Sequence, residues 1–177
     1  MGSDAPFKNS MPDDTGDTAR ARGGPPMVEV VIEIPRWSFV KRGSSGRIDF
    51  LSPLPCPFNY GSVPDRNGLE GDLLDAVVLG PRLPQGARIR LPARGAVGVA
   101  ERGYYDDKLI CSAQPLTQAA RCRVLRFFRL YSRAKRLLNG LRGRALDGHC
   151  AGWGDARVAL ARAPVRDERW TGPRVPF

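Results

Sequence analysis

The sequence predicts an α+β fold that is mainly β, in which a small barrel or sandwich is followed by helices. Two features carry this prediction. Between Met27 and Cys111, short apolar segments rich in β-branched residues alternate with Gly and Pro turns about every ten residues, which is typical of a small all-β unit. After Pro115, apolar residues recur three and four positions apart instead, and this spacing indicates a helix.

The predicted strands follow the apolar segments. Residues 27–34 are almost all apolar or β-branched and stop at Pro35, so we expect a well-buried strand there. Residues 73–79 stop in the same way at Gly80. Gly and Pro turns delimit four shorter predicted strands, at 47–51, 88–91, 96–100 and 108–111. The segments between strands, including Asn59-Tyr60-Gly61 and the Gly-rich stretch around His149, are interpreted as loops.

An apolar stripe predicts a long helix over residues 116–140. The stripe consists of Leu116, Ala120, Val124, Phe127, Phe128, Tyr131, Ala134 and Leu138, and it ends at Gly140. Residues 108–146 contain ten basic residues and no acidic one. We interpret the arginines as the solvated side of this helix and the aromatic residues as its packed side. A second, shorter helix is predicted over residues 155–162.

The chain divides into three segments. Residues 1–26 are rich in Asp, Gly, Pro, Ser and Thr without periodicity, which predicts a disordered leader. Residues 27–163 form the predicted domain, and residues 164–177 form an irregular tail. The leader lacks the apolar segment of a secretory signal, and the four cysteines include no Cys-x-x-Cys pair. We therefore expect reduced thiols and a cytoplasmic location.

The composition fits one globular domain with an anionic partner. The chain has 177 residues, 42% of them hydrophobic, which is enough for one core. Its 28 basic and 18 acidic residues give a net charge of +10, and this sign favours phosphates, nucleic acid or an anionic surface. No apolar run approaches the roughly 18 residues of a membrane span, so we expect no membrane partner.

Most acidic residues of the predicted domain form two groups, each of which precedes a strand. The first group is Glu70, Asp72 and Asp75, and the second is Glu101, Asp106 and Asp107, which Lys108 follows. Carboxylate oxygens are the ligands that Mg²⁺ prefers. Because Asp72 and Asp75 are three positions apart, strand alternation cannot place both on one face. They converge only if the chain curls at Gly71.

Eight short motifs occur in a fixed order across residues 28–160. They are Val30-Val31-Ile32-Glu33-Ile34-Pro35, Lys41, Pro57-Phe58-Asn59-Tyr60-Gly61-Ser62-Val63-Pro64, Glu70-Gly71-Asp72-x-x-Asp75, Val97-Gly98-Val99, Asp106-x-Lys108, Phe127-Phe128-x-x-Tyr131 and Gly152-Trp153. In this order they resemble the soluble inorganic pyrophosphatase family. Each motif alone is weak, whereas the ordered set is specific.

The resemblance implies a five-stranded, closed, OB-like barrel with flanking C-terminal helices, and Mg²⁺-dependent hydrolysis of pyrophosphate to two phosphates. It implies metal binding by Glu70, Asp75, Glu101 and Asp106. It makes Asp72 the base that acts on the attacking water and gives Glu33 an orienting role on nearby waters. Lys41, Tyr60, Lys108 and Tyr131 would hold phosphate oxygens. A homo-oligomer is a further implied partner.

The chain departs from the family at several of these positions. The family has Asp where this chain has Glu70 and Glu101, and the extra methylene moves each carboxylate by about 1.5 Å. An Arg, a Glu and a Lys of the family fall on Phe50, Gly43 and Ser132, and the nearby charges that could replace them are Arg42, Arg47 and Arg133.

Two interpretations of the departures stay open. The protein is either a divergent, working pyrophosphatase or a catalytically impaired relative that binds phosphate-containing ligands. A basic, OB-like nucleic-acid binder is the less favoured alternative, because no RNA-binding signature accompanies the arginines.

Overall fold

The computed structural model describes residues 23–38, 40–42, 48–51, 54–69, 71–101, 104–141, 143 and 148–166. The strands within them are β1 (Met27–Ile34), β2 (Val40–Arg42), β3 (Ile48–Leu51), β4 (Asn59–Asn67), β5 (Leu73–Val78), β6 (Arg88–Glu101), β7 (Tyr104–Cys111) and β8 (His149–Gly154), and the helices are α1 (Gln118–Leu141) and α2 (Ala156–Arg162). Most of the predicted leader and tail lies outside the described residues.

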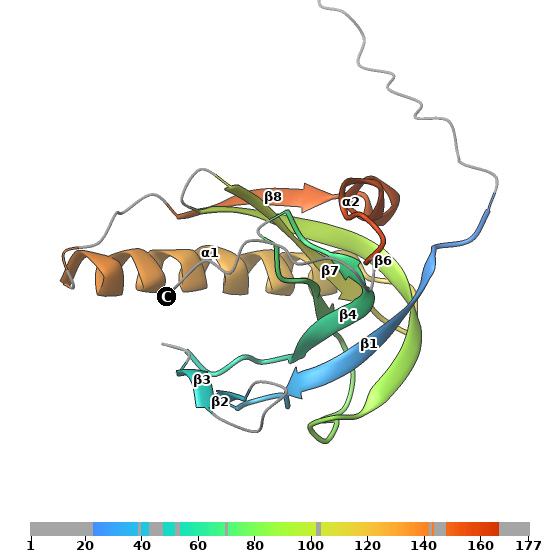
Figure 1. Cartoon of the computed structure of the whole chain (residues 1–177), viewed down its shortest axis with the longest axis horizontal. Helices are drawn as coiled ribbons and strands as arrows, with labels where there is room; N and C mark the ends of the chain where they lie inside the picture. The colour runs from blue at the N-terminus through green and yellow to red at the C-terminus, as the bar shows by residue number, and fades with distance from the viewer. Residues whose placement is uncertain are drawn as a thin grey trace, which may run out of the picture.

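Five strands close into a barrel. Their order is β1-β4-β5-β7-β6, and β6 pairs back onto β1. Only the β5–β7 pair is parallel. The first residues of β6, 88–92, pair with β1, while residues 93–101 pair with β7, so one long strand serves two neighbours. The predicted closed, OB-like barrel is confirmed, and Figure 1 shows α1 running along its side.

The predicted strands 88–91 and 96–100 are one strand, β6, and the predicted break between them is wrong. Pro92 lies opposite Met27, where β1 begins, so the missing N–H of proline costs little pairing there. The prediction of a loop at 59–61 is also wrong. Gly61 lies in β4 where that strand approaches β1 so closely that a Cβ would sit 1.9 Å from the Val31 carbonyl oxygen.

The prediction of a loop in the Gly-rich stretch around His149 is also wrong. The stretch around His149 forms β8, which pairs with β6 on the edge that β1 leaves free. Its Gly152 has a φ of 115°, which only glycine adopts readily. Both helices were predicted correctly to within two residues, and Asp155 caps α2 by accepting from the Arg157 and Val158 amides at 2.7 and 3.2 Å.

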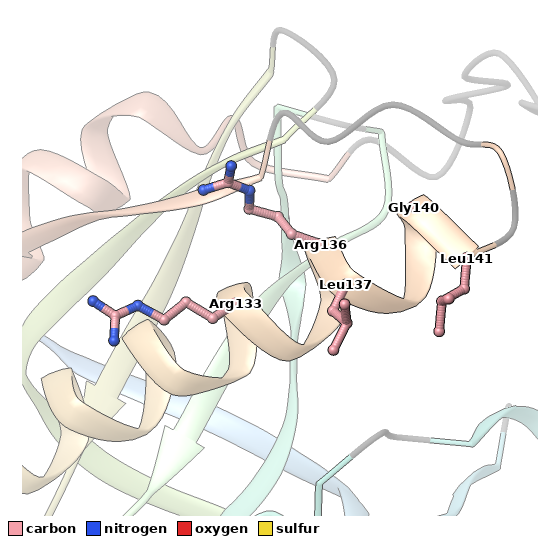
Figure 2. A pocket seen from close by; sticks show the side chains of 5 residues that line it. All are labelled: Arg133, Arg136, Leu137, Gly140 and Leu141. Atoms are coloured by element: carbon pink, nitrogen blue, oxygen red, sulfur yellow. The ribbon is translucent and has the colours of Figure 1, made fainter.

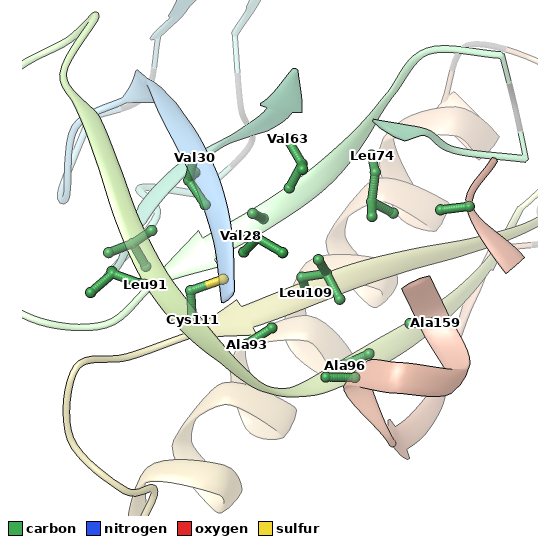
Figure 3. Close-up of a cluster of buried hydrophobic side chains, with 14 of the residues drawn as sticks. Val28, Val30, Val63, Leu74, Leu91, Ala93, Ala96, Leu109, Cys111 and Ala159 are labelled. Atoms are coloured by element: carbon green, nitrogen blue, oxygen red, sulfur yellow. The ribbon is translucent and has the colours of Figure 1, made fainter. Parts of the chain in front are cut away.

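A cluster of apolar side chains fills the barrel interior. Its buried strand residues are Val28, Val30, Ile32, Val63, Leu74, Ala76, Val78, Leu91, Ala93, Ala96, Leu109 and Cys111 (Figure 3). Because side chains alternate along a strand, every second residue of β1, β5 and β7 points inward. Ala156 and Ala159 of α2, with Ala163 directly after the helix, pack into the same cluster, so this helix closes one end of the interior.

The outer face of the barrel carries a second apolar cluster. Val77, Val97 and Ile110 of the barrel strands pack there against Val124 and Phe128 of α1. Trp153 of β8 covers Gly95, where a Cβ would meet its ring at 2.3 Å, and Arg121 of α1 lies 5.4 Å from the ring centroid. The predicted packing of Phe127 and Phe128 of α1 is confirmed, and Trp153 packs into the same cluster.

Two further features complete the fold. All four cysteines are free, with Cys56 and Cys111 buried and Cys122 exposed. In the described part of the chain, neither helix has the length and apolarity that a membrane crossing requires.

Candidate active site

Charged side chains meet on the outer face of β5 and β7. Asp75 and Lys108 are partners in the parallel register of these strands. Asp106 precedes Lys108 by two residues and therefore shares its face. The Lys108 Nζ donates to Oδ2 of both Asp75 and Asp106. The three side chains are only 12–19% exposed, so these ion pairs are largely shielded from water. We call Asp75, Asp106 and Lys108 the carboxylate–lysine cluster.

Tyr60 lies beside the carboxylate–lysine cluster on β4. The Lys108 Nζ is 6.0 Å from the Tyr60 ring centroid. Burial, followed by the negative charge of Asp75, raises the pKa of the Tyr60 phenol well above its usual value. The phenol therefore stays protonated at neutral pH and can donate a hydrogen bond.

Glu33 joins the same region through β4. A bulge between Ile32 and Ile34 interrupts the β1–β4 pairing at this residue. Ser62 donates its hydroxyl to Glu33 Oε1 at 2.7 Å, and Ser62 is itself the register partner of Asp75. Glu33, to which the resemblance assigns an orienting role, is thus connected through β4 to the strand that carries Asp75.

Asn59, next to Tyr60, has a structural function. Its side chain is fully buried, and Oδ1 accepts from the amides of Arg36 and Leu83 at 3.1 and 2.9 Å. Its Nδ2 donates to the Pro81 carbonyl at 2.8 Å. These bonds tie two loops to the start of β4 and so fix the strand on which Tyr60 stands.

The charges of the carboxylate–lysine cluster depend on one another. Burial disfavours the charged form of Lys108, but the negative charges of Asp75 and Asp106 outweigh it and raise the pKa of Lys108 well above its usual value. For Asp106, burial raises the pKa of the carboxyl, and the positive charge of Lys108 only partly opposes that effect. The cluster is therefore one lysine cation shared by two carboxylates.

Helix α1 contributes two groups, one of which the sequence analysis missed. Tyr131 is half-buried, and its ring lies 5.9 Å from that of Phe127, which in turn packs 5.8 Å from Phe58 at the entry to β4. Lys135 follows one helical turn later; burial raises the pKa of Asp106, and the charge of Lys135 opposes that rise only slightly. The sequence analysis did not single out this lysine. Its spacing of four residues from Tyr131 was the available signal.

The structure places Asp72 in the turn before β5. Gly71 has a φ of 95°, which confirms the predicted curl, and the turn is closed by the Gly68 amide donating to the Asp72 carbonyl at 2.7 Å. The Asp72 side chain is exposed, and no hydrogen bond joins it to another described residue. The structure therefore brings Asp75, Asp106 and Lys108 together and leaves Asp72 at the edge of the site.

Several predicted residues cannot be placed. Glu70, Gly43 and Arg47 lie outside the described residues, and the same holds for the side chains of Lys41, Arg42, Phe50 and Glu101. Ser132 is 7% exposed, and its hydroxyl has no hydrogen-bond partner among the residues the structure describes.

Arg133 lies on the exposed side of α1. With Arg136, Leu137, Gly140 and Leu141 it lines an open hollow of about 380 Å³ near the end of the helix. Figure 2 shows the two guanidinium groups extending along the helix away from the leucines. The hollow contains none of the predicted site residues, so the expectation that Arg133 replaces a missing charge of the site gains no support.

The donor set of the carboxylate–lysine cluster fits a hard cation. Asp75 and Asp106 aim oxygens at one point, and the positive Lys108 ammonium already binds both of them. Within the described ranges no three His, Cys, Asp or Glu side chains converge. The other two predicted ligands, Glu70 and Glu101, have side chains outside those ranges.

Comparisons of the sequence with known proteins find similarity to inorganic pyrophosphatases. The sequence model of the family described as inorganic pyrophosphatase matches residues 30–126. The inorganic pyrophosphatase of Gluconobacter oxydans is 36% identical over 92 residues, or 48% of this chain and 53% of that protein. A soluble inorganic pyrophosphatase of Oryza sativa is 33% identical over 103 residues, or 52% of this chain and 48% of that protein. The chain thus spans about half the length of these curated relatives.

Solved structures extend the likeness to the whole fold. The inorganic pyrophosphatase of Thermus thermophilus has a TM-score of 0.63 at 24% identity, covering 83% of this chain and 90% of that chain. The structure from Coxiella burnetii has a TM-score of 0.62 at 24% identity, covering 79% and 92%. At this identity the structures show the fold, while the family match spans more than half of the sequence. This chain belongs to the inorganic pyrophosphatase family.

Proposed function

We propose that the protein is a Mg²⁺-dependent inorganic diphosphatase that hydrolyses pyrophosphate to two phosphates. The observation that carries the proposal is the carboxylate–lysine cluster beside Tyr60, on the outer face of the barrel of a chain from this family. Partly shielded carboxylates next to a cation and a protonated phenol suit a multiply charged phosphate substrate.

The substrate's charge explains the need for the cationic and phenolic groups. Pyrophosphate carries several negative charges that repel an attacking oxygen. Lys108 and the phenols of Tyr60 and Tyr131 would donate to phosphate oxygens, with Lys41 as a further predicted donor. Because the pKa of Tyr60 is raised by burial, its phenol keeps the proton that it donates.

The carboxylates divide into ligands and a base. Asp75 and Asp106, with Glu70 and Glu101, would hold Mg²⁺. When bound, Mg²⁺ would neutralise phosphate charge and lower the pKa of the attacking water. Asp72, exposed at the edge of the site, would accept the proton of that water. Glu33, anchored by Ser62, would orient neighbouring waters.

The test is phosphate release from pyrophosphate by the purified protein, with Mg²⁺ and with EDTA. We expect release that requires the metal. Replacing Asp72→Asn should reduce the rate by about 100-fold or more while Mg²⁺ binding, measured by calorimetry, persists. Asp65→Asn is the matched control, because Asp65 is also exposed and lies in β4.

Two outcomes would contradict the proposal. Full activity in Asp72→Asn would show that another group is the base. No release by folded wild-type protein would overturn the hydrolase assignment and leave the alternative of a barrel that binds phosphate-containing ligands.

A further inference from the structure

The chain that leaves α2 lies against the far end of β4 (Figure 1). Val165 forms an antiparallel bridge with Arg66 of that strand. The Arg66 Nη1 also donates to the carbonyl of Ala163, the residue directly after α2, at 3.3 Å. We call residues 163–166 the α2 strap. It is joined to β4 through a side chain as well as through the backbone.

Two backbone hydrogen bonds complete the pairing of the α2 strap with β4. The Arg166 amide donates to the Asp65 carbonyl at 2.9 Å, and the Asn67 amide donates to the Pro164 carbonyl at 3.0 Å. Asn67 is buried, so the second of these bonds is shielded from water. The α2 strap therefore holds three consecutive residues of β4.

Neither neighbouring strand supports β4 at this point. Its pairing with β1 ends at Ser62. Its pairing with β5 is interrupted after Val63 and resumes only at Asn67, which lies opposite Leu73. The residues in between, 64–66, form a bulge without a register partner in the described β1 or β5. The α2 strap supplies the backbone partners that these two strands do not.

The end of β4 that the α2 strap holds leads directly into the turn that carries Asp72. The Gly68 amide donates to the Asp72 carbonyl at 2.7 Å, and the Gly71 amide donates to the Gly68 carbonyl at 3.1 Å. The Asp72 side chain, in contrast, has no hydrogen bond to another described residue. The backbone alone positions this carboxylate, so its place depends on where β4 ends.

The other end of the α2 strap is tied to the strand of the carboxylate–lysine cluster. Arg162, the last residue of α2, donates to the Asp107 carboxylate from Nε and Nη2 at 2.8 and 2.9 Å. Asp107 directly follows Asp106, which belongs to the cluster. A continuous series of hydrogen bonds therefore connects the strand of Asp106, through α2 and its strap, to the turn of Asp72.

We propose that the α2 strap is a positioning element for the reaction, which holds the turn of Asp72 in place relative to the carboxylates of β5 and β7. The inference rests on the proposed function, because that function assigns the role of base to Asp72. A base must lie within hydrogen-bond reach of the water whose proton it accepts, and a displacement of about 1 Å can reduce the rate by about 100-fold. An exposed side chain on a turn keeps such a position only if the backbone beneath it is held.

The experiment compares Arg166→Pro with Arg166→Ala. Both variants lose the exposed arginine side chain, but only proline removes the N–H that donates to the Asp65 carbonyl. We expect Arg166→Pro to speed hydrogen exchange of the Gly68 and Gly71 amides, measured by NMR, by about fivefold or more. It should also lower kcat for pyrophosphate by about fivefold or more while KM stays within about twofold. Arg166→Ala should stay within about twofold of wild type in all three measurements.

A double variant separates the positioning of Asp72 from a general loosening of the protein. In the Asp72→Asn background the residual rate no longer depends on that carboxylate, so adding Arg166→Pro should change this rate by less than about twofold. An additional loss as large as in the wild-type background would overturn the inference, and so would unchanged exchange or unchanged kcat in Arg166→Pro. Arg66→Met, which removes the bond to Ala163, serves the same test if the proline variant does not fold, with Arg66→Lys as its conservative control.

Hydrogen exchange distinguishes this inference from the proposed function. A folded wild-type protein that releases no phosphate refutes the hydrolase, whereas faster exchange of the Gly68 amide in Arg166→Pro still supports the α2 strap as the element that holds the turn. Normal hydrolysis by the wild type with unchanged exchange in Arg166→Pro refutes the inference alone. No hydrolysis together with unchanged exchange refutes both.

Discussion

The two faces of strands β5 and β7 differ in chemistry: the inner face is apolar around residues such as Leu109, and the outer face carries charged side chains. Their inward residues, such as Leu74 and Leu109, are almost completely buried and meet only apolar neighbours. Their outward residues include Asp75 and Lys108, which bind each other beside α1. The closed interior stabilises the barrel, while the outer face, partly covered by a helix, carries the charged groups. Residues that stabilise the barrel and residues of the candidate site therefore alternate along the same strands.

Asp106 and Asp107 show the same division within one dipeptide. Asp106 faces outward and binds Lys108. Asp107 faces the other way, is 7% exposed, and accepts from Arg162 Nε and Nη2 at 2.8 and 2.9 Å. The Arg162 guanidinium also lies 5.0 Å from the Tyr105 ring centroid, so this pair anchors α2 to β7. Asp106 therefore belongs to the candidate site, whereas Asp107 stabilises the packing of α2 on β7.

The largest expected effect on stability comes from breaking the interior. Leu109 is fully buried in the barrel, so Leu109→Ala should lower the free energy of unfolding by about 3 kcal/mol, through lost burial and the cavity that remains. Leu137→Ala is the control, because Leu137 is 69% exposed and should cost less than about 0.5 kcal/mol. Urea denaturation measures both. Equal costs would contradict the burial of Leu109 in the barrel interior.

A smaller effect is expected from the outer face. Lys108→Met leaves Asp75 and Asp106 without their shared cation, and we expect it to lower the unfolding free energy by about 2 kcal/mol near pH 7. The deficit should shrink as the pH falls and the carboxylates gain protons, beginning with Asp106, whose pKa burial raises. Urea unfolding at several pH values measures this dependence.

The control for that variant is Arg133→Met, which removes an exposed charge from α1. It should change the unfolding free energy by less than about 0.5 kcal/mol at any of these pH values. A Lys108→Met deficit that is independent of pH would mean that lost packing, rather than lost charge pairing, causes it.

The smallest effect concerns the thiols. Burial raises the pKa of Cys111 to about 12 and that of Cys56 to about 11. In the folded protein at pH 8, an aromatic disulfide reagent should therefore modify exposed Cys122 quickly and these two only after unfolding. Cys122→Ser should remove the fast phase. Rapid modification of Cys111 would show that the barrel interior is open to solvent.

The raised pKa of Cys111 predicts that the protein loses stability at alkaline pH. The folded pKa of Cys111 exceeds the value of 9.0 for a free thiol, so its contribution to stability is complete below pH 9 and is lost as the pH rises toward 12. Cys111→Ala should reduce the steepness of that loss. An unchanged alkaline slope would assign the loss to other groups.

The prediction of the fold from the sequence succeeded where local pattern and tertiary position agree. The apolar run of β1 and the apolar stripe of α1 were read correctly because both elements are buried on a continuous face. It failed at β4 and β8, where glycines were taken as turns. Gly61 serves a close approach of two strands, which depends on a partner 30 residues away in the sequence.

The candidate site was predicted in the same uneven way. Ordered motifs identified Asp75, Asp106, Lys108 and Tyr60, and the structure brings them together. The motifs did not identify Lys135, because it belongs to none of them. The sequence analysis also named Arg133, which is exposed, as a possible replacement for a charge that the site lacks. Exposure and burial around a helix depend on which flank meets the barrel.

By itself, the sequence determined the class of fold, the two helices and the family, because hydrophobic period and motif order are local properties of the chain. The tertiary structure decided the closure of the barrel through β6 and the opposite orientations of Asp106 and Asp107. Both depend on contacts between side chains from distant segments of the chain. Strand register and helix orientation determine these contacts, and local spacing in the sequence does not encode them.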